Sequence, residues 1–136
     1  MTQRLSADSK ERKGIPLARG FLDYFPNAMA EVAKLSQLAN EKHNPGQEMH
    51  WSFGKSNDHA DCELRHMIDR GEIDDEDGLL HDVKKAWRAM ADLETTLIAR
   101  GAKPGRGVRI SEEDLAALRG EPIEAPTLLV SPRRRR

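Results

Sequence analysis

The sequence predicts an all-α fold with three long helices and one short C-terminal helix. Apolar residues recur every three or four positions in three long stretches, as on one face of an amphipathic helix. Strong breakers separate these stretches, at residues 43–46 (HNPG), at Gly71 and at Gly101. No substantial strand is expected before residue 100.

The first helix is expected to begin near Pro26, because proline is tolerated in a first turn, and to end by residues 43–46. Glu31 lies beside its apolar face. The second helix should run from about Ser56 to Arg70 and end at Gly71. The predicted inner faces of these two helices are Phe25, Ala28, Val32, Leu35 and Ala39 in the first, and Ala60, Leu64, Met67 and Ile68 in the second.

The third helix should extend from Leu79 to about Ala99, with Asp77 or Asp75 as its N-cap. A short fourth helix is predicted from Ser111, because an acidic first turn follows that residue. The predicted inner face of the third helix is Leu80, Val83, Trp87, Met90 and Leu97.

A chain of 136 residues suits one domain. The predicted organisation is a flexible segment at 1–13, a helical domain at 14–100, a loop with the short helix at 101–120, and a disordered basic tail at 121–136. Hydrophobic residues make up 38% and charged residues 33%. A chain this polar buries little apolar surface alone, so a homodimer or homotetramer is expected.

Charge and composition narrow the function. A net charge of −1 gives no field that would attract nucleic acid, and the Arg133–Arg136 run is too short to change that. The apolar runs are too short to span a membrane. The N-terminus lacks the apolar core of a signal peptide, and the single Cys62 fits a reducing compartment. The cytoplasm is the expected location.

The acidic run at residues 74–77 suggests a calcium loop, but its register fails. With Gly78 as the invariant sixth residue, position 1 is Ile73, which has no side-chain oxygen. Position 12 is Lys84, a cation where a bidentate glutamate belongs. These acids therefore need another explanation, and the simplest is a turn and cap that place His81 on the third helix.

Three other carboxylates form a candidate site for Mg²⁺ or Mn²⁺. Glu31 lies on the first helix, and Asp58 and Asp61 lie on the second, at or near the faces that should be buried. Antiparallel packing could bring them together, and hard cations prefer oxygen ligands and phosphates. The alternative is ordinary surface pairing, of Asp61 with Arg65 and of Asp58 with Lys55.

Histidines and cations supply further candidates. His59 and His66 share one face of the second helix, and His81 opens the third, where His81-Asp82 also resembles the dipeptide of HD phosphohydrolases. Lys84 flanks an apolar stripe and is the best candidate of its cluster to neutralise a polyphosphate. The loop from Lys42 to Trp51 could hold a base by hydrogen bonds and stacking, or Trp51 could simply cover the core edge.

These residues together resemble a known family. The segments EKHNPGQEMHW (41–51) and DHADCELRHMIDRGEIDDEDGLLHDVKKAWRAMADLE (58–94) look like those of the phage and bacterial dATP/dGTP diphosphohydrolases, which are related to the all-α MazG-like pyrophosphohydrolases. The resemblance covers residues 14–98. Its most specific parts are Asp61…Leu64-Arg65-His66, Gly71-Glu72…Asp74, Asp77-Gly78-x-x-His81 and Ala86-Trp87.

The resemblance implies an oligomeric, MazG-like helical bundle that hydrolyses purine deoxynucleoside triphosphates to the monophosphate and pyrophosphate with Mg²⁺ or Mn²⁺. One departure concerns the metal, because Lys34 stands three residues after Glu31 where MazG-like enzymes carry an acid. The alternatives are a non-catalytic helical module that binds a nucleotide or a partner, and an HD-type phosphohydrolase. The predicted site comprises Glu31, Asp58 and Asp61 as metal ligands, Arg65, His66 and His81 as catalytic residues, and Lys42, His43, Asn44, Trp51 and Lys84 as substrate contacts.

Overall fold

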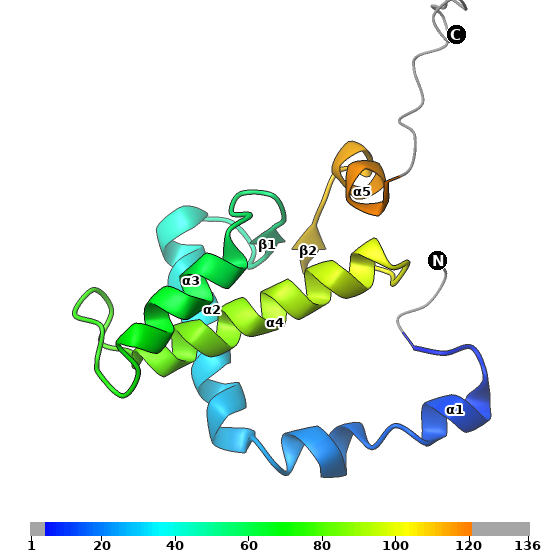
Figure 1. The fold of residues 1–136 in the computed structure, drawn as a ribbon, viewed down its shortest axis with the longest axis horizontal. Helices are drawn as coiled ribbons and strands as arrows, with labels where there is room; N and C mark the ends of the chain where they lie inside the picture. The colour runs from blue at the N-terminus through cyan, green and yellow to red at the C-terminus, as the bar shows by residue number, and fades with distance from the viewer. Residues whose placement is uncertain (1–4, 121–136) are drawn as a thin grey trace, which may run out of the picture.

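The structure, a computed structural model, describes residues 5–120 and is predominantly helical, as predicted. α4 lies at the centre, and α2, α3 and α5 each pack against it. Figure 1 shows α4 as the long yellow-green helix with α3 alongside. The elements in order are α1 (Ser9–Lys13), the π-helix η1 (Ala18–Leu22), α2 (Pro26–His43), β1 (Trp51–Ser52), α3 (His59–Ile68), α4 (His81–Ala99), β2 (Val108–Arg109) and α5 (Glu112–Arg119).

The ends of α2 and α5 lie where local sequence signals place them. α2 begins at Pro26 and ends at His43, directly before the Asn44-Pro45-Gly46 breaker. Ser111 caps α5, and its hydroxyl accepts a hydrogen bond from the Asp114 amide at 3.0 Å. Such signals act within a few residues of the helix end.

α3 and α4 begin later than predicted. α3 starts at His59 rather than Ser56, and α4 starts at His81 with Leu80 as its N-cap, in place of Asp77 or Asp75. The side chain of Asp77 instead accepts a hydrogen bond from the Leu79 amide at 3.1 Å. That bond closes a turn within the loop before α4, so it does not serve the helix N-terminus.

A two-stranded parallel sheet fastens the loop after α2 to the segment after α4. Trp51 pairs with Val108, and Ser52 pairs with Arg109. The Trp51 amide donates to the Gly107 carbonyl at 2.8 Å, and the Phe53 amide donates to the Arg109 carbonyl at 2.9 Å. These bonds join segments more than fifty residues apart, a contact that local periodicity does not reveal.

The core is small and lies along α3, α4 and the loop between them. Its buried apolar residues within 5–120 are Cys62, Leu79, Val83, Ala91 and Ile98.

Among the helices of residues 5–120, none is both long and apolar enough to cross a membrane.

The predicted inner faces of the helices are partly wrong. On α3, Leu64 is 61% exposed and Ile68 is 77% exposed, whereas His59 and Cys62 are buried. The polar side of α3 meets α4 because its histidines find hydrogen-bonding partners there, as described below. Other residues of the predicted inner faces are also exposed, because the described chain has no further layer to cover them. They are Phe25 at the start of α2 and Leu80, Met90 and Leu97 near or on α4.

Candidate functional site

The acidic loop, residues 74–79, has an ordered backbone. The Asp74 amide donates to the Leu79 carbonyl at 2.7 Å, and the Gly78 amide donates to the Asp74 carbonyl at 2.8 Å. Gly78 has φ +77°, a conformation that glycine adopts without steric cost. The Oδ1 atom of Asp74 accepts a hydrogen bond from the Glu76 amide at 2.9 Å. One carboxylate oxygen of Asp74 therefore holds the loop, and its other oxygen faces α4.

Lys84, from the first turn of α4, occupies the centre of these acids. Its Nζ atom lies 2.5 Å from Asp74 Oδ2, 3.0 Å from Asp77 Oδ2 and 3.8 Å from Glu76 Oε1. The Lys84 side chain is only 12% exposed. The acids thus surround an ammonium group of the same chain, and the lysine that breaks the calcium-loop register is their partner.

The charges in this cluster stabilise one another. The hydrogen bond from Lys84, followed by that from the Glu76 amide, lowers the pKa of Asp74 to about 2. Burial acts against the charged form of Lys84, but its hydrogen bonds to Asp74 and Asp77 outweigh burial and raise its pKa. Both groups are therefore charged at neutral pH.

His66 and His81 form a pair beside Lys84. Their Nδ1 atoms lie 2.9 Å apart, and the Nδ1 atom of His81 lies 3.9 Å from Asp74 Oδ2. One ring must donate and the other accept in this contact, so the pair holds a single proton between the two Nδ1 atoms. Burial, and then the charge of His81, lower the pKa of His66. His66 is thus neutral at pH 7 and able to accept a proton.

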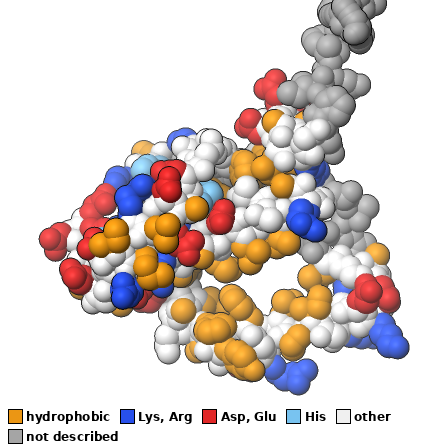
Figure 2. Space-filling model, viewed as in Figure 1, with side chains coloured by type: hydrophobic (Ala, Val, Ile, Leu, Met, Phe, Trp, Pro, Cys, Tyr) orange, Lys and Arg blue, Asp and Glu red, His pale blue; other side chains and the backbone are white. Residues whose placement is uncertain are grey.

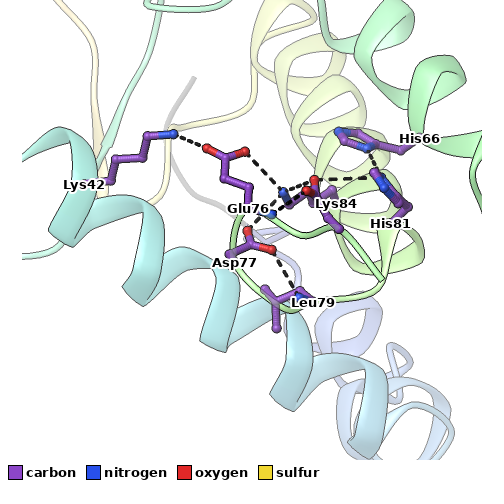
Figure 3. A network of polar contacts seen from close by, with 8 residues as sticks. Lys42, His66, Glu76, Asp77, Leu79, His81 and Lys84 are labelled. Atoms are coloured by element: carbon purple, nitrogen blue, oxygen red, sulfur yellow. Dashed lines mark hydrogen bonds and ion pairs between the residues drawn. The ribbon is translucent and has the colours of Figure 1, made fainter. Parts of the chain in front are cut away.

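Lys42 extends the cluster to a third helix. Its ammonium group, near the end of α2, pairs with Glu76, which also lies within ion-pair distance of Lys84. Figure 3 shows these side chains converging from α2, the acidic loop, α3 and α4. We call this cluster the candidate site; it comprises Lys42, His66, Asp74, Glu76, Asp77, His81 and Lys84.

Arg65, predicted to be catalytic, belongs to a separate polar cluster. Its Nη2 atom lies 3.2 Å from Asp58 Oδ2, and both side chains are at least half exposed. Hydrogen bonds from Ser56, first, and Arg65 lower the pKa of Asp58 to about 2. Arg88 connects this cluster to α4, donating to Ser56 Oγ at 2.8 Å and to His59 Nδ1 at 3.0 Å.

The three predicted metal ligands are not brought together in one chain. Glu31 pairs with Lys34 at 2.9 Å, Asp58 pairs with Arg65, and Asp61 is exposed. In residues 5–120, no group of three or more His, Cys, Asp or Glu side chains is placed to hold a metal ion. The single chain therefore does not fit a metal centre by itself, and this ligand assignment stays a prediction.

Contacts with α2, α3 and α4 hold the predicted base-binding loop in place. Trp51 packs against Trp87, with ring centroids 5.6 Å apart, and against His59 at 6.1 Å, so it covers the edge of the core. Asn44 is buried and donates to Asn40 Oδ1 at 3.0 Å, whereas His43 is exposed. Of the predicted substrate contacts, only Lys42 and Lys84 lie at the candidate site.

Sequence reasoning missed the site roles of Asp74, Glu76 and Asp77. The available signal was Lys84 at the failed twelfth position of the calcium register, because a cation there is a natural partner for the acids.

Asn40 was also missed. Its side chain donates to the Gln47 carbonyl at 3.1 Å and accepts from the His50 amide at 3.3 Å. A buried asparagine inside an amphipathic helix gives no such signal in the sequence.

Replacing Asn40 by leucine should lower the free energy of unfolding by about 2–3 kcal/mol, because buried polar groups would lose their partners. Urea denaturation measures the change. Asn57→Leu is the matched control, since Asn57 is exposed, and it should shift the free energy by less than about 0.5 kcal/mol. Equal effects of the two substitutions would contradict the structural role of Asn40.

Comparison with protein families identifies the chain. The model of the family described as "dATP/dGTP diphosphohydrolase, N-terminal" matches residues 6–104, well over half of the sequence. The chain belongs to this family. Searches of curated proteins and of solved structures gave no match.

The match places the candidate site within the family's domain. In this dATP/dGTP diphosphohydrolase N-terminal domain, the matched range includes α2, α3, the acidic loop and α4, and it ends before β2 and α5. Every residue of the candidate site, from Lys42 to Lys84, lies inside it. The resemblance seen in the sequence is therefore confirmed.

Proposed function

We propose that this protein hydrolyses dATP and dGTP to the deoxynucleoside monophosphate and pyrophosphate. Family membership across residues 6–104 is the observation that carries the proposal. The candidate site supports it, because it combines cations suited to phosphate with a neutral histidine suited to accepting a proton. The substrate is a cytoplasmic metabolite, so the proposed compartment is the cytoplasm.

The charge of the candidate site favours a metal-bound nucleotide as the substrate. Lys42 and Lys84 supply two positive charges, while Asp74, Glu76 and Asp77 supply three negative ones, a net charge of −1 with neutral histidines. A bare triphosphate would be repelled. The Mg²⁺ or Mn²⁺ complex of the nucleotide carries less negative charge, and its phosphates already supply oxygen ligands to the ion.

The histidine pair is placed for general base catalysis. In the proposed reaction a water molecule adds to phosphorus, the α–β phosphoanhydride bond breaks, and pyrophosphate leaves. His66 accepts the proton of the water, and His81 orients His66 through the contact between their Nδ1 atoms. Lys42, whose side chain is 60% exposed, stabilises the charge that develops on the phosphate oxygens. Lys84 is surrounded by acids and holds the acidic loop beside the histidines.

The HD-type alternative has less support. Asp82, the second residue of the His81-Asp82 dipeptide, accepts a hydrogen bond from the Gly71 amide at 2.6 Å. This bond fastens the segment after α3 to the first turn of α4, so one oxygen of the carboxylate that an HD site would use for metal already has a structural role.

Product analysis tests the proposed function. The purified chain is incubated with each dNTP and either Mg²⁺ or Mn²⁺, and the products are separated by ion-exchange chromatography. The expected products are dAMP or dGMP and pyrophosphate in equal amounts. Release of triphosphate or phosphate would instead indicate an HD-type enzyme, and nucleotide binding without turnover would indicate a non-catalytic module.

Substitutions assign the activity to the chain. Lys84→Met should abolish the hydrolysis, and Lys34→Met, on the exposed surface of α2, should preserve it.

Asp61→Asn tests the predicted metal ligand separately, because loss of activity that excess Mn²⁺ restores would place Asp61 at the ion. Unchanged activity in Asp61→Asn would remove Asp61 from the metal-ligand assignment.

A further inference from the structure

Arg88, on α4, carries a positive charge that no acid of the described chain neutralises. Figure 2 shows acidic and basic side chains intermingled at the α3 end of the molecule. There Arg65 pairs with Asp58, and Lys84 pairs with Asp74. The partly buried guanidinium of Arg88 instead contacts neutral groups, and within residues 5–120 no carboxylate lies at ion-pair distance from it. A charge that is partly removed from water is costly without a counter-ion, so this arrangement favours an anionic ligand.

The hydrogen bonds of Arg88 leave one whole edge of its guanidinium open. The Nη1 atom donates to Ser56 Oγ at 2.8 Å and to His59 Nδ1 at 3.0 Å. Those two bonds use both N–H groups of Nη1, and no acceptor within residues 5–120 serves Nε or Nη2. The Nε and Nη2 atoms form the planar fork that binds two oxygens of one phosphate group in parallel.

The neighbours of Arg88 hold this edge in place. The Cζ atom of Arg88 lies 5.5 Å from the centroid of the Trp87 ring, and the Trp87 and His59 rings are in edge contact with centroids 6.1 Å apart. Arginine can only donate, so His59 accepts at Nδ1 and keeps its own proton on Nε2. Burial, and then the charge of Arg88, lower the pKa of His59, which is therefore neutral at pH 7. The guanidinium is thus positioned before any ligand binds.

Two polar pairs cross between α3 and α4, which lie alongside each other (Figure 1). His66 contacts His81, and His59 contacts Arg88. In each helix the two residues are seven apart, so the helices are antiparallel and the pairs are separated by about 10 Å, or two turns. Burial and the charges of His81 and Lys84 lower the pKa of His66, and the charge of Arg88 adds to them. Arg88 therefore acts electrostatically on the candidate site.

We propose that Arg88 binds the terminal phosphates of the substrate, the part that leaves as pyrophosphate, while the α-phosphorus lies at His66. This proposal rests on the proposed function and deepens it, because it makes the site select triphosphates over monophosphates. A chain of three phosphates, with the reach of both side chains, spans the distance between the two polar pairs, and a single phosphate does not. Lys84 is not free for this role, since three acids surround it.

Isothermal titration calorimetry with inorganic pyrophosphate and Mg²⁺ tests this subsite without turnover. Arg88→Gln should weaken pyrophosphate binding about 10–100-fold, the usual effect of losing hydrogen bonds from a charged group. Arg88→Lys keeps the charge but loses the planar fork, so it should restore only part of the affinity. The matched control is Arg100→Gln, at an exposed arginine that caps the other end of the same helix, and it should bind like the wild type.

Binding of dAMP separates a phosphate contact from a structural role. Arg88→Gln should leave the affinity for dAMP nearly unchanged, because a single phosphate at His66 does not reach Arg88. A residue that only fastened Ser56 and His59 to α4 would weaken both ligands alike when it was replaced. Hydrolysis is measured separately. Pyrophosphate binding that depends on Arg88 in a chain without turnover would support the subsite and contradict the proposed function. Turnover with pyrophosphate binding unchanged by Arg88→Gln would contradict the subsite alone.

Arginine modification of the unsubstituted protein covers the case in which a variant does not fold. Phenylglyoxal reacts with accessible guanidinium groups, and mass spectrometry identifies the modified residues. Pyrophosphate with Mg²⁺ should protect Arg88 and should not protect Arg100. The proposal would be overturned by a wild-type chain that does not bind pyrophosphate, by equal losses of affinity for pyrophosphate and dAMP in Arg88→Gln, or by modification of Arg88 that pyrophosphate does not slow.

Discussion

Replacing Lys84 by methionine is expected to lower the free energy of unfolding by about 2–3 kcal/mol and to abolish nucleotide hydrolysis. The substitution leaves Asp74 and Asp77 close together without their shared cation. Breaking a fully buried ion pair costs about 3–5 kcal/mol. The expected loss is smaller here because the three side chains are not fully buried. The Lys84 side chain is 12% exposed, that of Asp74 is 18% exposed and that of Asp77 is 19% exposed.

Urea denaturation of Lys84→Met and of Lys34→Met measures this difference. Lys34 pairs with Glu31 on the surface, with side chains 56% and 41% exposed, so its loss should cost at most about 1 kcal/mol. Adding Asp74→Asn to Lys84→Met should recover part of the stability, because one unpaired carboxylate is removed. Equal losses for the two lysine variants would show that the acidic loop does not depend on Lys84.

The ion pair between Asp74 and Lys84 predicts a pH dependence of the free energy of unfolding. The pKa of Asp74 is lowered from 3.8 to about 2, so its contribution is present above about pH 4 and is lost as the pH falls toward 2. Lys84→Met should lack this part of the acid destabilisation. The comparison requires urea titrations of both proteins between pH 2 and 5.

Replacing His66 by glutamine is expected to reduce kcat about 10²–10⁴-fold, the usual range for loss of a general base. Glutamine is neutral and fills a similar volume, so the free energy of unfolding should change little at pH 7. His50→Gln is the matched control, because His50 lies outside the candidate site and the Nδ1 atom of its ring lies at hydrogen-bonding distance, 2.9 Å, from the nearby Glu48 carbonyl. Its kcat should be unchanged.

The pH profile separates a general base from a structural residue. The pKa of His66 is lowered below 6.5 by burial and by His81, so the neutral, proton-accepting form is dominant above that value. Wild-type kcat should therefore be level near pH 7 and fall on the acid side of pH 6.5. The residual activity of His66→Gln should lose this acid limb. An unchanged profile would exclude His66 as the base.

Local sequence signals determined much of the secondary structure. The predominantly helical class follows from apolar residues at helical spacing. The limits of α2 and the Ser111 cap of α5 follow from proline, glycine and capping residues, whose effects extend over only a few positions. The family resemblance was also visible in the sequence, in segments such as Asp77-Gly78-x-x-His81 and Ala86-Trp87. Lys42, His66, His81 and Lys84 were predicted as site residues, and they do lie together.

Only the tertiary structure decided which groups face one another. Hydropathy placed Leu64 and Ile68 on the inner face of α3, yet His59 and Cys62 are buried, because burial depends on what the neighbouring element offers. The acids at residues 74–77 had no evident partner until the loop folded back onto Lys84. Glu31, Asp58 and Asp61 were predicted to share one metal ion, but within residues 5–120 no group of three or more His, Cys, Asp or Glu side chains is placed to hold one. Sequence patterns fix local conformation, whereas ion pairs and buried faces depend on contacts between residues far apart in the chain.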